Sequence, residues 1–338
     1  MHVESVIAIG EALIDRLGPA GGDPAFDLPV KDCFGGAPAN VACALSRLGI
    51  NVSFLGSLGN DVIGRNFQDL MIHRGINTIG LQKDQNRPTR IVLVKRDIDG
   101  ERFFGGFEGD QCLGFADQAI SREQIIKDWP MVKGKAKWLV VGTIPLASET
   151  SSDALLWCMN KAWHTGIKIV LDLNWRPTFW RDKGSTVMEP SVKEKDKIIS
   201  IFKKVSLIKL AKEEAEWFFD SSNPIAISLS LPHKPSVVVT DGSNPISWLL
   251  NNHNGRSYAI APPNVVDTTG AGDAFTAGLI YKLLSVELDQ ISKQMANEII
   301  QFAIACGAHV CKGLGAIDAQ PYLEDIDKLL FYSDGGVS

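Results

Sequence analysis

The feature that most constrains the fold of this chain is an alternation of short apolar runs with stretches of helical periodicity. Apolar runs rich in valine, isoleucine and leucine occupy residues 6–9, 52–55, 138–141, 167–171, 207–210 and 237–239. Helical patterns occupy residues 40–48, 63–74, 152–165, 213–219 and 272–284. Strands that alternate with helices form a parallel sheet, because each helix returns the chain to the edge where the next strand begins. We therefore expect a doubly wound, mostly parallel α/β sheet covered by helices.

Two segments interrupt this alternation. Residues 11–30 and 89–110 look like strands of a separate sheet, and the second contains an Asp99-Gly100 pair, which favours a hairpin turn. Both segments leave the α/β pattern and soon return to it, so we expect a small β-sheet lid over the carboxyl ends of the main strands. The main domain then comprises residues 1–10, 31–88 and 111–330, and residues 331–338 form a frayed tail.

The composition argues against several classes of partner. The chain has 338 residues and a formal net charge of −5, whereas nucleic-acid-binding domains usually carry a basic face. No apolar run approaches the roughly 18 residues of a membrane span, and the first residues lack the basic leader of a signal peptide. The six cysteines are scattered, without Cys-x-x-Cys pairs or zinc-like spacing. We expect a cytoplasmic protein with reduced thiols and no nucleic-acid or membrane partner.

A glycine-rich motif follows the first interruption. Gly35 and Gly36 precede Ala-Pro-Ala and then Asn40, and paired glycines let the backbone approach a ligand closely. The Asn40 amide both donates and accepts hydrogen bonds, as recognition of neighbouring hydroxyl groups requires. A glycine turn followed by an asparagine that caps a helix explains the same residues without a ligand.

A second motif, Thr-Thr-Gly-Ala-Gly-Asp at residues 268–273, leads directly into an apolar helix. Glycines before a helix expose consecutive backbone N–H groups, which bind phosphate oxygens together with the positive end of the helix dipole. Asp273 is then placed beside a transferring phosphoryl group, where a carboxylate can take the proton from an attacking hydroxyl. The alternative is that Asp273 is only a favourable acidic residue in a first helical turn.

Taken together, residues 35–59 and 267–280 resemble the two signatures of the ribokinase-like (PfkB-type) carbohydrate kinases, and the resemblance covers nearly the whole chain. It implies ATP-dependent transfer of a phosphoryl group to a sugar hydroxyl, on a doubly wound domain with a β lid. Asp273 matches the catalytic base of that family. The other matches fall in two groups: Gly270, Ala271 and Gly272 match the anion hole, and Asp15, Gly35, Gly36 and Asn40 match positions that hold sugar hydroxyls.

The resemblance also implies where ATP lies. Residues 237–242 (Val-Val-Val-Thr-Asp-Gly) resemble the strand and turn that approach the nucleotide, with Thr240 and Gly242 near its phosphates or ribose. A plain strand-to-turn junction explains this segment nearly as well. Ile304 lies in the segment that resembles the adenine-side helix. Relatives close to plant fructokinases carry asparagine at that position, so we expect altered contacts near the base.

Metal ions follow from the same resemblance. Glu214 matches a glutamate that acts on Mg²⁺ through water, although Ala211 stands where many relatives have asparagine. A solvated helix face is the alternative for Glu214. Asp267 and the carbonyl of Thr269 match a monovalent-cation site, so K⁺ is a candidate second ion.

The expected sugar rests on residues 172–180 (Asp-Leu-Asn-Trp-Arg-Pro-Thr-Phe-Trp), which resemble fructokinases and related ketose or sugar-acid kinases. Asn174 follows a strand, and Arg176 offers a rigid fork of donors suited to a phosphate or carboxylate. A brace between Arg176 and Asp172 is the alternative. Arg102, in the lid, is a further candidate sugar contact. We expect D-fructose to be phosphorylated at its O6 hydroxyl.

Other interpretations stay open at this point. A related kinase for 2-keto-3-deoxygluconate, ribose or a nucleoside fits the same motifs, and a sugar acid calls for cationic contacts such as Arg102 or Arg90. A non-catalytic kinase-like binding protein is a second alternative, although the base and both glycines are intact. The Gly-x-Gly-x-x-Gly turn of dinucleotide enzymes is missing after residues 6–10, and no P-loop motif occurs. Because exposed lid strands often pair, we expect a homodimer through the lid.

Overall fold

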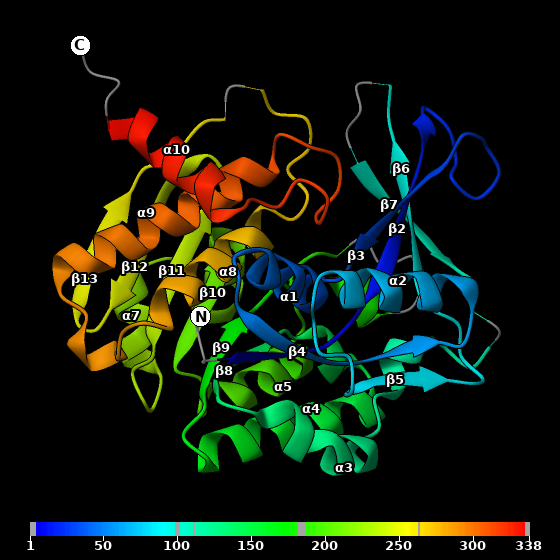
Figure 1. Cartoon of the computed structure of the whole chain (residues 1–338), viewed down its shortest axis with the longest axis horizontal. Coiled ribbons are helices and arrows are strands. Elements are labelled where there is room, and N and C mark those ends of the chain that lie inside the picture. Colours follow the sequence, from blue (N-terminus) through cyan, green and yellow to red (C-terminus); the bar gives the residue numbers. More distant parts are fainter. Residues whose placement is uncertain (1–4, 99–101, 111, 182–186, 263, 335–338) are drawn as a thin grey trace.

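The computed structural model describes residues 5–98, 102–110, 112–181, 187–262 and 264–334. Figure 1 shows a large sheet with helices on both faces and a smaller sheet that projects from one end of it. The nine strands of the large sheet have the order β13-β12-β11-β10-β9-β8-β1-β4-β5, and the four strands of the small sheet have the order β3-β2-β6-β7. This architecture confirms the fold class expected from the sequence.

The large sheet is parallel except at one edge. β1 pairs in parallel with β4 and β8, and the parallel ladder continues through β5, β9, β10 and β11, whereas β12 and β13 are added as antiparallel hairpins. The strands are β1 (Ser5–Ile9), β4 (Asn51–Gly59), β5 (Leu81–Asp84), β8 (Ala136–Val141), β9 (Lys168–Asp172), β10 (Leu207–Ala211), β11 (Ser236–Asp241), β12 (Asn244–Leu250) and β13 (His253–Ser257). All parallel strands therefore end at the same edge, where ligands bind in α/β sheets.

Ten α-helices surround the sheets in the described part of the chain. They are α1 (Ala37–Arg47), α2 (Val62–His73), α3 (Arg122–Lys133), α4 (Glu149–His164), α5 (Val192–Phe202), α6 (Lys212–Phe219), α7 (Pro224–Ser230), α8 (Ala271–Leu283), α9 (Lys293–Val310) and α10 (Leu323–Asp334). Residues 331–334, which we assigned to a frayed tail, instead belong to the last turn of α10.

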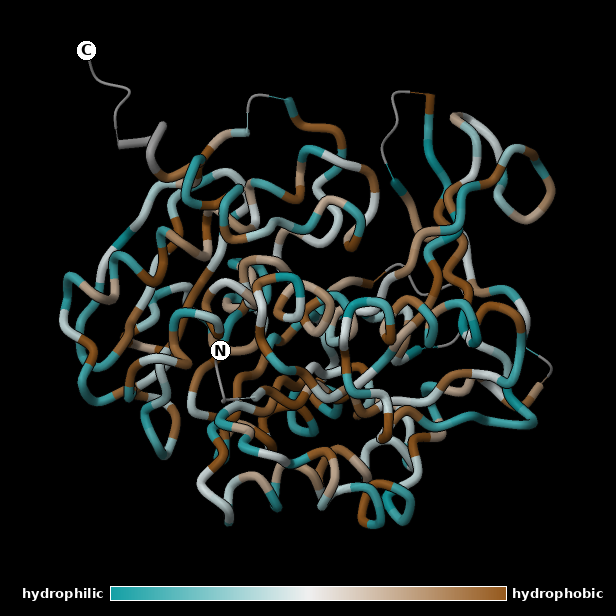
Figure 2. The backbone as a smooth tube through the Cα atoms, viewed as in Figure 1, coloured by the Kyte–Doolittle hydropathy of each residue, from teal (hydrophilic) through white to brown (hydrophobic). Residues whose placement is uncertain are grey.

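Successive side chains of the central strands enter two different apolar layers. In β8, Trp138 and Val140 belong to the layer under α1, α2, α8 and α9, whereas Leu139 and Val141 belong to the layer under α3 to α7. All four side chains are at most 1% exposed. Burial on both faces explains why these strands read as unbroken apolar runs, which Figure 2 shows along the centre of the molecule.

The small sheet is built from β2 (Leu13–Ala20), β3 (Lys31–Gly35), β6 (Ile91–Arg96) and β7 (Arg102–Glu108). Strand β3 differs from our expectation, because residues 31–35 had been assigned to the main domain. It pairs antiparallel with β2 and so carries the chain from the small sheet directly into the Gly35–Gly36 turn. The predicted Asp99-Gly100 turn lies outside the described residues.

Within the described ranges, no helix is both long enough and apolar enough to cross a membrane.

Candidate active site

The two glycine motifs meet where helices α1 and α8 begin. Helix α1 starts directly after Gly35 and Gly36, and α8 starts directly after Gly270. Asn40 Nδ2 donates a 2.7 Å hydrogen bond to Asp273 Oδ2, which joins residues 233 positions apart in the sequence. The structure therefore places the amide of the first motif against the carboxylate of the second.

The first turn of α8 depends on a residue without a side chain. Gly270 has a φ of +81°, and a Cβ atom there would lie 2.5 Å from the Cβ of Ala316. The N–H of Ala271 donates to a carbonyl of the preceding turn at 3.2 Å. The next two N–H groups, at Gly272 and Asp273, have no carbonyl partner within the helix because they lie in its first turn. These two groups are the best-placed donors for an anion.

Asp273 carries a perturbed carboxyl group. Its burial and the nearby Asp172 carboxylate raise the pKa of Asp273 to about 6, while Asn40, Lys209 and Arg176 act in the opposite direction. A carboxyl with this pKa is ionised at neutral pH and still basic enough to accept a proton.

Lys209, in β10, is a site residue that the sequence motifs did not indicate. Its side chain is buried, and Nζ lies 3.0 Å and 3.2 Å from the two Asp172 carboxylate oxygens. A Cβ atom added to Gly272 would lie 3.0 Å from Nζ, so the ammonium group sits against the first turn of α8. Burial alone would lower the pKa of Lys209, but the Asp172, Glu214 and Asp273 carboxylates raise it overall. The available signal was a single lysine inside the apolar run at residues 207–210.

The Asp172 carboxylate links this lysine to α8. Thr276 Oγ1 lies 2.8 Å from Asp172 Oδ2 and 3.0 Å from the carbonyl oxygen of Gly272. The charged pair is therefore attached to the same helical turn that carries Asp273.

The first motif lies beside a second acidic group. A Cβ atom on Gly35 would lie 2.7 Å from Asp15 Oδ2, so the glycine leaves that oxygen accessible. Burial raises the pKa of Asp15 to about 6, against the opposing effect of Arg102 and Arg176. The Asp15 side chain is only partly exposed.

Arg102 connects the lid to the loop that precedes α8. It donates to Asp267 Oδ2 at 2.7 Å and to Thr269 Oγ1 at 2.5 Å. Asp267 also accepts hydrogen bonds from the N–H of Gly315 and from the N–H and hydroxyl of Thr269. Although burial favours the neutral form, these donors hold the pKa of Asp267 below its usual value. Both carboxylate oxygens are thus already engaged.

Glu214 connects the loop after β9 to the start of α6. The Glu214 carboxylate accepts the N–H of Trp175 at 2.6 Å and the N–H of Ala211 at 2.7 Å. Glu214 is 6% exposed, so the alternative of a solvated helix face is wrong. Burial raises its pKa. Asn174 in the same loop has a left-handed backbone with a φ of +42°.

Arg176 does not brace this loop through Asp172, which pairs with Lys209 instead. The Arg176 side chain is exposed, and its Nη1 donates to the carbonyl of Trp175 at 3.0 Å. Its charge nevertheless opposes the raised pKa values of both Asp15 and Asp273.

A pocket of about 530 Å³ borders the first turn of α8, where Thr268, Ala271 and Gly272 line it. It brings together four expected nucleotide-site positions: Thr240, Gly242, Gly272 and Ile304. Its lining is mostly apolar and includes Ile246, Ile260, Phe275 and Cys311. The Ile304 side chain is 4% exposed, so this position contributes shape and no polar contact.

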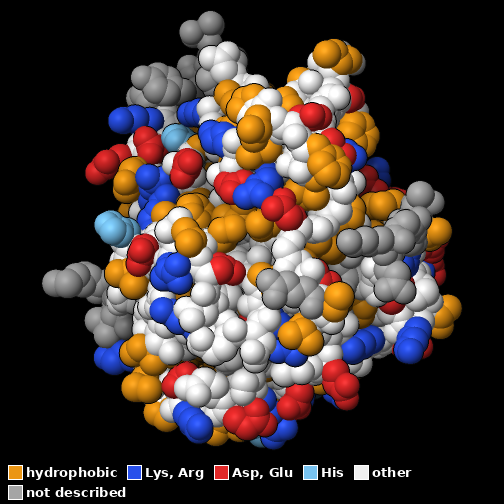
Figure 3. Space-filling view, turned by 90° about the vertical axis from the view of Figure 1, so that its right-hand side faces the viewer, with side chains coloured by type: hydrophobic (Ala, Val, Ile, Leu, Met, Phe, Trp, Pro, Cys, Tyr) orange, Lys and Arg blue, Asp and Glu red, His pale blue; other side chains and the backbone are white. Residues whose placement is uncertain are grey.

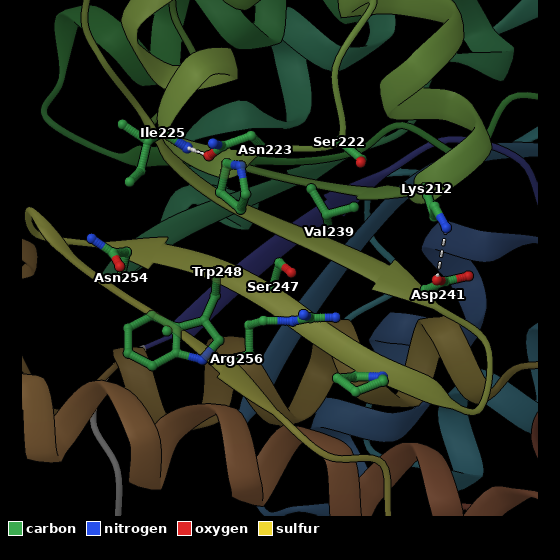
Figure 4. Close-up of a pocket in the computed structure, with 13 residues that line it drawn as sticks. Lys212, Ser222, Asn223, Ile225, Val239, Asp241, Ser247, Trp248, Asn254 and Arg256 are labelled. Atoms are coloured by element: carbon green, nitrogen blue, oxygen red, sulfur yellow. Dashed lines mark hydrogen bonds and ion pairs between the residues drawn. The ribbon is translucent and has the colours of Figure 1, made fainter.

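A second pocket, of about 510 Å³, lies between α6, α7 and the hairpin strands β11 to β13. Figure 4 shows Arg256 extending along it and Lys212 paired with Asp241, at 3.3 Å. Val239 and Asp241 line this pocket, whereas Thr240 lines the first. Because neighbouring strand residues point to opposite faces, the two pockets lie on opposite sides of the sheet. None of the expected site residues lines the second pocket.

Comparisons with known proteins identify relatives of nearly the same length. The chain is 31% identical over 331 residues to probable fructokinase-7 of Arabidopsis thaliana, which covers 96% of this chain and 92% of that protein. It is 30% identical over 334 residues to fructokinase-1 of Oryza sativa subsp. japonica, covering 97% and 98% of the two chains.

Solved structures show the same fold. Fructokinase from Vibrio cholerae O395, in its fructose, ADP and calcium ion bound form, has a TM-score of 0.80 at 25% identity and covers 97% of this chain and 99% of its own. Fructokinase with bound ATP from Xylella fastidiosa has a TM-score of 0.80 at 24% identity, covering 98% and 99%. The model of the pfkB family carbohydrate kinases matches residues 3–322. The chain therefore belongs to the pfkB family of carbohydrate kinases.

Proposed function

We propose that this protein transfers the γ-phosphoryl group of ATP to the O6 hydroxyl of D-fructose, giving fructose 6-phosphate and ADP. The observation that carries the proposal is the position of Asp273, a buried carboxylate in the first turn of α8 that is hydrogen-bonded to Asn40. A proton acceptor beside unpaired backbone N–H groups is the arrangement that phosphoryl transfer to a hydroxyl requires. The fructokinases that share about 30% identity with the chain support fructose as the acceptor.

The reaction uses Asp273 as general base. Its carboxylate accepts the proton of the sugar hydroxyl while the hydroxyl oxygen forms a bond to the γ-phosphorus and the bond to the ADP oxygen breaks. The N–H groups of Gly272 and Asp273 donate to the phosphoryl oxygens, with Gly270 and Ala271 shaping the turn that presents them. Lys209 keeps a positive charge against this turn and favours the ionised base.

The acceptor sugar is proposed to lie between the first motif and Asp273. Asp15 and Asn40 supply groups that bind vicinal hydroxyls, and Gly35 and Gly36 let the sugar approach the backbone. Three further residues are proposed to contact the sugar: Asn174 and Arg176, in the loop after β9, and Arg102, in the lid. Arg176 is the best supported of these because its exposed charge acts on both neighbouring carboxyl groups.

ATP is proposed to occupy the pocket beside α8. The Thr240 and Gly242 turn faces the phosphates or ribose, and the apolar wall around Ile304 and Phe275 suits the flat face of the base. The phosphate end then points to Gly272, which lines this pocket and also belongs to the anion-binding turn.

Mg²⁺ is proposed to accompany ATP, where it would neutralise phosphate charge. Glu214 fits only a contact through water, because both of its carboxylate oxygens already accept backbone N–H groups. Within the described ranges, no group of three or more His, Cys, Asp or Glu side chains is arranged to hold a metal ion directly. The chain therefore relies on the nucleotide phosphates for most of the ion's ligands.

A monovalent cation such as K⁺ fits Asp267 and Thr269 poorly in this structure. Asp267 Oδ2 already accepts from Arg102 and Gly315, and Oδ1 accepts from Thr269. A cation at the carboxylate has to displace the Arg102 guanidinium, which already occupies Asp267 Oδ2. We therefore expect K⁺ to stimulate turnover by a small factor.

The sugar-acid alternative loses one of its two candidate contacts. Arg90 is 4% exposed, and its Nε and Nη2 donate to the Asp117 carboxylate at 2.8 Å and 2.9 Å. Phe107, Phe115 and Phe179 surround the guanidinium, with ring centroids 4.2–4.8 Å from Cζ. Arg90 therefore has no accessible donor fork to offer a sugar carboxylate.

A homodimer is proposed to form through the lid. The small sheet ends in edge strands β3 and β7, and Phe103 and Phe104 of β7 are 52% and 44% exposed. Phe26 and Leu28, in the loop between β2 and β3, are more than 80% exposed. Figure 3 shows hydrophobic side chains on this side of the molecule. Such a surface is typical of a protein contact, and a purely monomeric sedimentation profile would exclude the dimer.

The lid is proposed to comprise residues 11–30 and 89–110 together with β3, and the rest of the described chain to form the main domain.

The cytoplasm is proposed as the location of the protein, which fits six free cysteines and a net charge of −5. A tagged protein recovered outside the cytoplasm would exclude that location.

The function is tested by sugar-dependent ADP release from Mg-ATP, with and without K⁺, using fructose, ribose, glucose, 2-keto-3-deoxygluconate and adenosine as acceptors. We expect fructose to give the highest kcat/KM, and mass spectrometry and NMR of the product to show a phosphate on O6. Higher kcat/KM for another acceptor would refute fructose, and no release with any acceptor would support the non-catalytic alternative.

Replacement of the base separates binding from chemistry. Asp273→Asn is expected to lower kcat by about 10²–10⁴-fold, because the proton acceptor is lost while the backbone donors stay in place. ATP affinity, measured by calorimetry, should change little. The matched control is Asp289→Asn, an exposed aspartate in the 3-10 helix Leu288–Gln290 beyond the C-terminal end of α8. Near-normal turnover in Asp273→Asn would remove Asp273 from the mechanism.

Asn40 is expected to act mainly on the sugar. Asn40→Ala should raise the KM for fructose at least tenfold and the KM for ATP less than threefold, since a polar contact worth roughly 1.4 kcal/mol corresponds to a factor of ten. Initial-rate kinetics with each substrate varied in turn give both constants. Equal increases in the two KM values would mean that the first motif is structural.

The pH profile tests the counter-charge supplied by Lys209. In the unmodified enzyme, kcat should fall as pH decreases through about 6, because Asp273 then becomes protonated. Lys209→Met removes a positive charge that favours ionised Asp273, so the acid limb should move to higher pH. The exposed neighbour Lys212 provides the control variant Lys212→Met, which should leave the limb in place. An unmoved limb in a folded Lys209→Met protein contradicts this assignment.

A further inference from the structure

Glu11 is a buried carboxyl group that the mechanism above does not use. It follows β1, and its side chain is 2% exposed. Its Oε1 accepts the N–H of Ala37 at 3.0 Å. Its Oε2 is buried and has no hydrogen-bond partner among the described residues.

The neighbouring turn requires support that its own residues cannot provide. Gly36 is the N-cap residue of α1 and makes no side-chain hydrogen bond to the first turn, unlike Asp61 at the start of α2. The Ala37 N–H is one of the helix N–H groups that lack a partner within the helix. Glu11 therefore supplies, from another segment, an acceptor for the first N–H of a helix whose N-cap residue has no side chain.

Glu11 also determines the shape of the turn through its backbone. Gly36 has a φ of +101°, and a Cβ atom there would lie 2.5 Å from the carbonyl oxygen of Glu11. The Gly36 carbonyl in turn accepts the N–H of Asn40 at 2.8 Å. Main chain and side chain of one residue thus contact both sides of the turn that precedes Asn40.

In the part of the chain that the structure describes, no lysine or arginine forms a salt bridge with Glu11. Asp117, in the 3-10 helix Ala116–Ala119, and Asp273, on α8, both act on it, and Asp117 is itself paired with Arg90 at the start of β6. Burial is the largest effect on Glu11 and, with the Asp117 and Asp273 carboxylates, raises its pKa to about 8. The backbone N–H groups of Glu11 and Ala37 act in the opposite direction. Glu11 is accordingly an uncharged carboxylic acid at neutral pH.

We propose that Glu11 is a positioning residue for the acceptor sugar: it caps α1 and holds the Gly35–Gly36 turn and Asn40 in the geometry that binds the sugar. This inference rests on the proposed function of the same site. Ionisation of Glu11 places an unbalanced charge between Asp117 and Asp273, so the turn should lose its geometry when that proton is lost. Glutamine has the same shape, keeps the Oε1 acceptor and cannot ionise.

The test compares the native enzyme with Glu11→Gln, Glu11→Ala and the exposed control Glu298→Gln, between pH 6.5 and 9. The KM for fructose of the native enzyme should rise above about pH 8, whereas that of Glu11→Gln should stay flat. At pH 7, Glu11→Ala should raise the KM for fructose about tenfold while the KM for ATP changes less than twofold. The KM for fructose of Glu11→Gln should stay close to the native value. The control should follow the native profile.

Thermal unfolding gives a readout that needs no substrate. Because the folded protein keeps a proton on Glu11 that the unfolded chain loses above about pH 4.5, the native protein should lose stability relative to Glu11→Gln as pH rises from about 4.5 to about 8. Effects of Asp15 and Asp273 largely cancel in this difference because both proteins contain them.

The possible failures can be told apart. Absence of turnover in the native enzyme with every acceptor refutes the proposed function, and the unfolding comparison still reports whether Glu11 is neutral. An active native enzyme with the same pH profiles of KM and of stability as Glu11→Gln overturns the inference about Glu11. Equal increases in both KM values for Glu11→Ala would assign Glu11 a general structural role and overturn the positioning role.

Discussion

The hydrogen bond between Asn40 and Asp273 is the contact on which the site depends. It joins the first turns of α1 and α8, whose N-termini both point to the carboxyl edge of the sheet. Burial favours the neutral form of a carboxyl group, whereas helix N-termini, hydrogen-bond donors and nearby cations favour its ionised form. The pairing of Lys209 with Asp172 provides one such cation inside the protein, where water cannot screen it.

The buried charges also explain how the lid and the main domain are connected. Arg102 joins β7 to Asp267, and Arg90 joins the base of β6 to Asp117 within a cluster of aromatic rings. Replacement of one member of such a buried pair leaves the other charge unpaired, which typically costs 3–5 kcal/mol. The small sheet is therefore attached through interactions that are sensitive to charge and geometry, close to the Gly35–Gly36 turn.

Much of the fold could be predicted because its central strands are apolar on both faces. The expected strand at residues 207–210 is β10, and the expected helix at 272–284 is α8 with a boundary shifted by one residue. Strands β12 and β13 were missed, since polar residues such as Asn244 and Asn254 interrupt their pattern. Strand β3 was assigned to the wrong part because its pairing with β2 is a long-range contact that local sequence does not encode.

The sequence by itself determined the family, the two motifs and the identity of Asp273 as the candidate base, because glycines at special backbone angles and a carboxylate at a helix start have local physical signatures. Only the tertiary structure decided which groups balance the charges. It paired Asp172 with Lys209 and not with Arg176, and Arg102 with Asp267. It also placed Glu11 as the cap of a helix that begins with glycine. Such pairings depend on distances across the fold, and on burial that turns a weak surface attraction into a strong one.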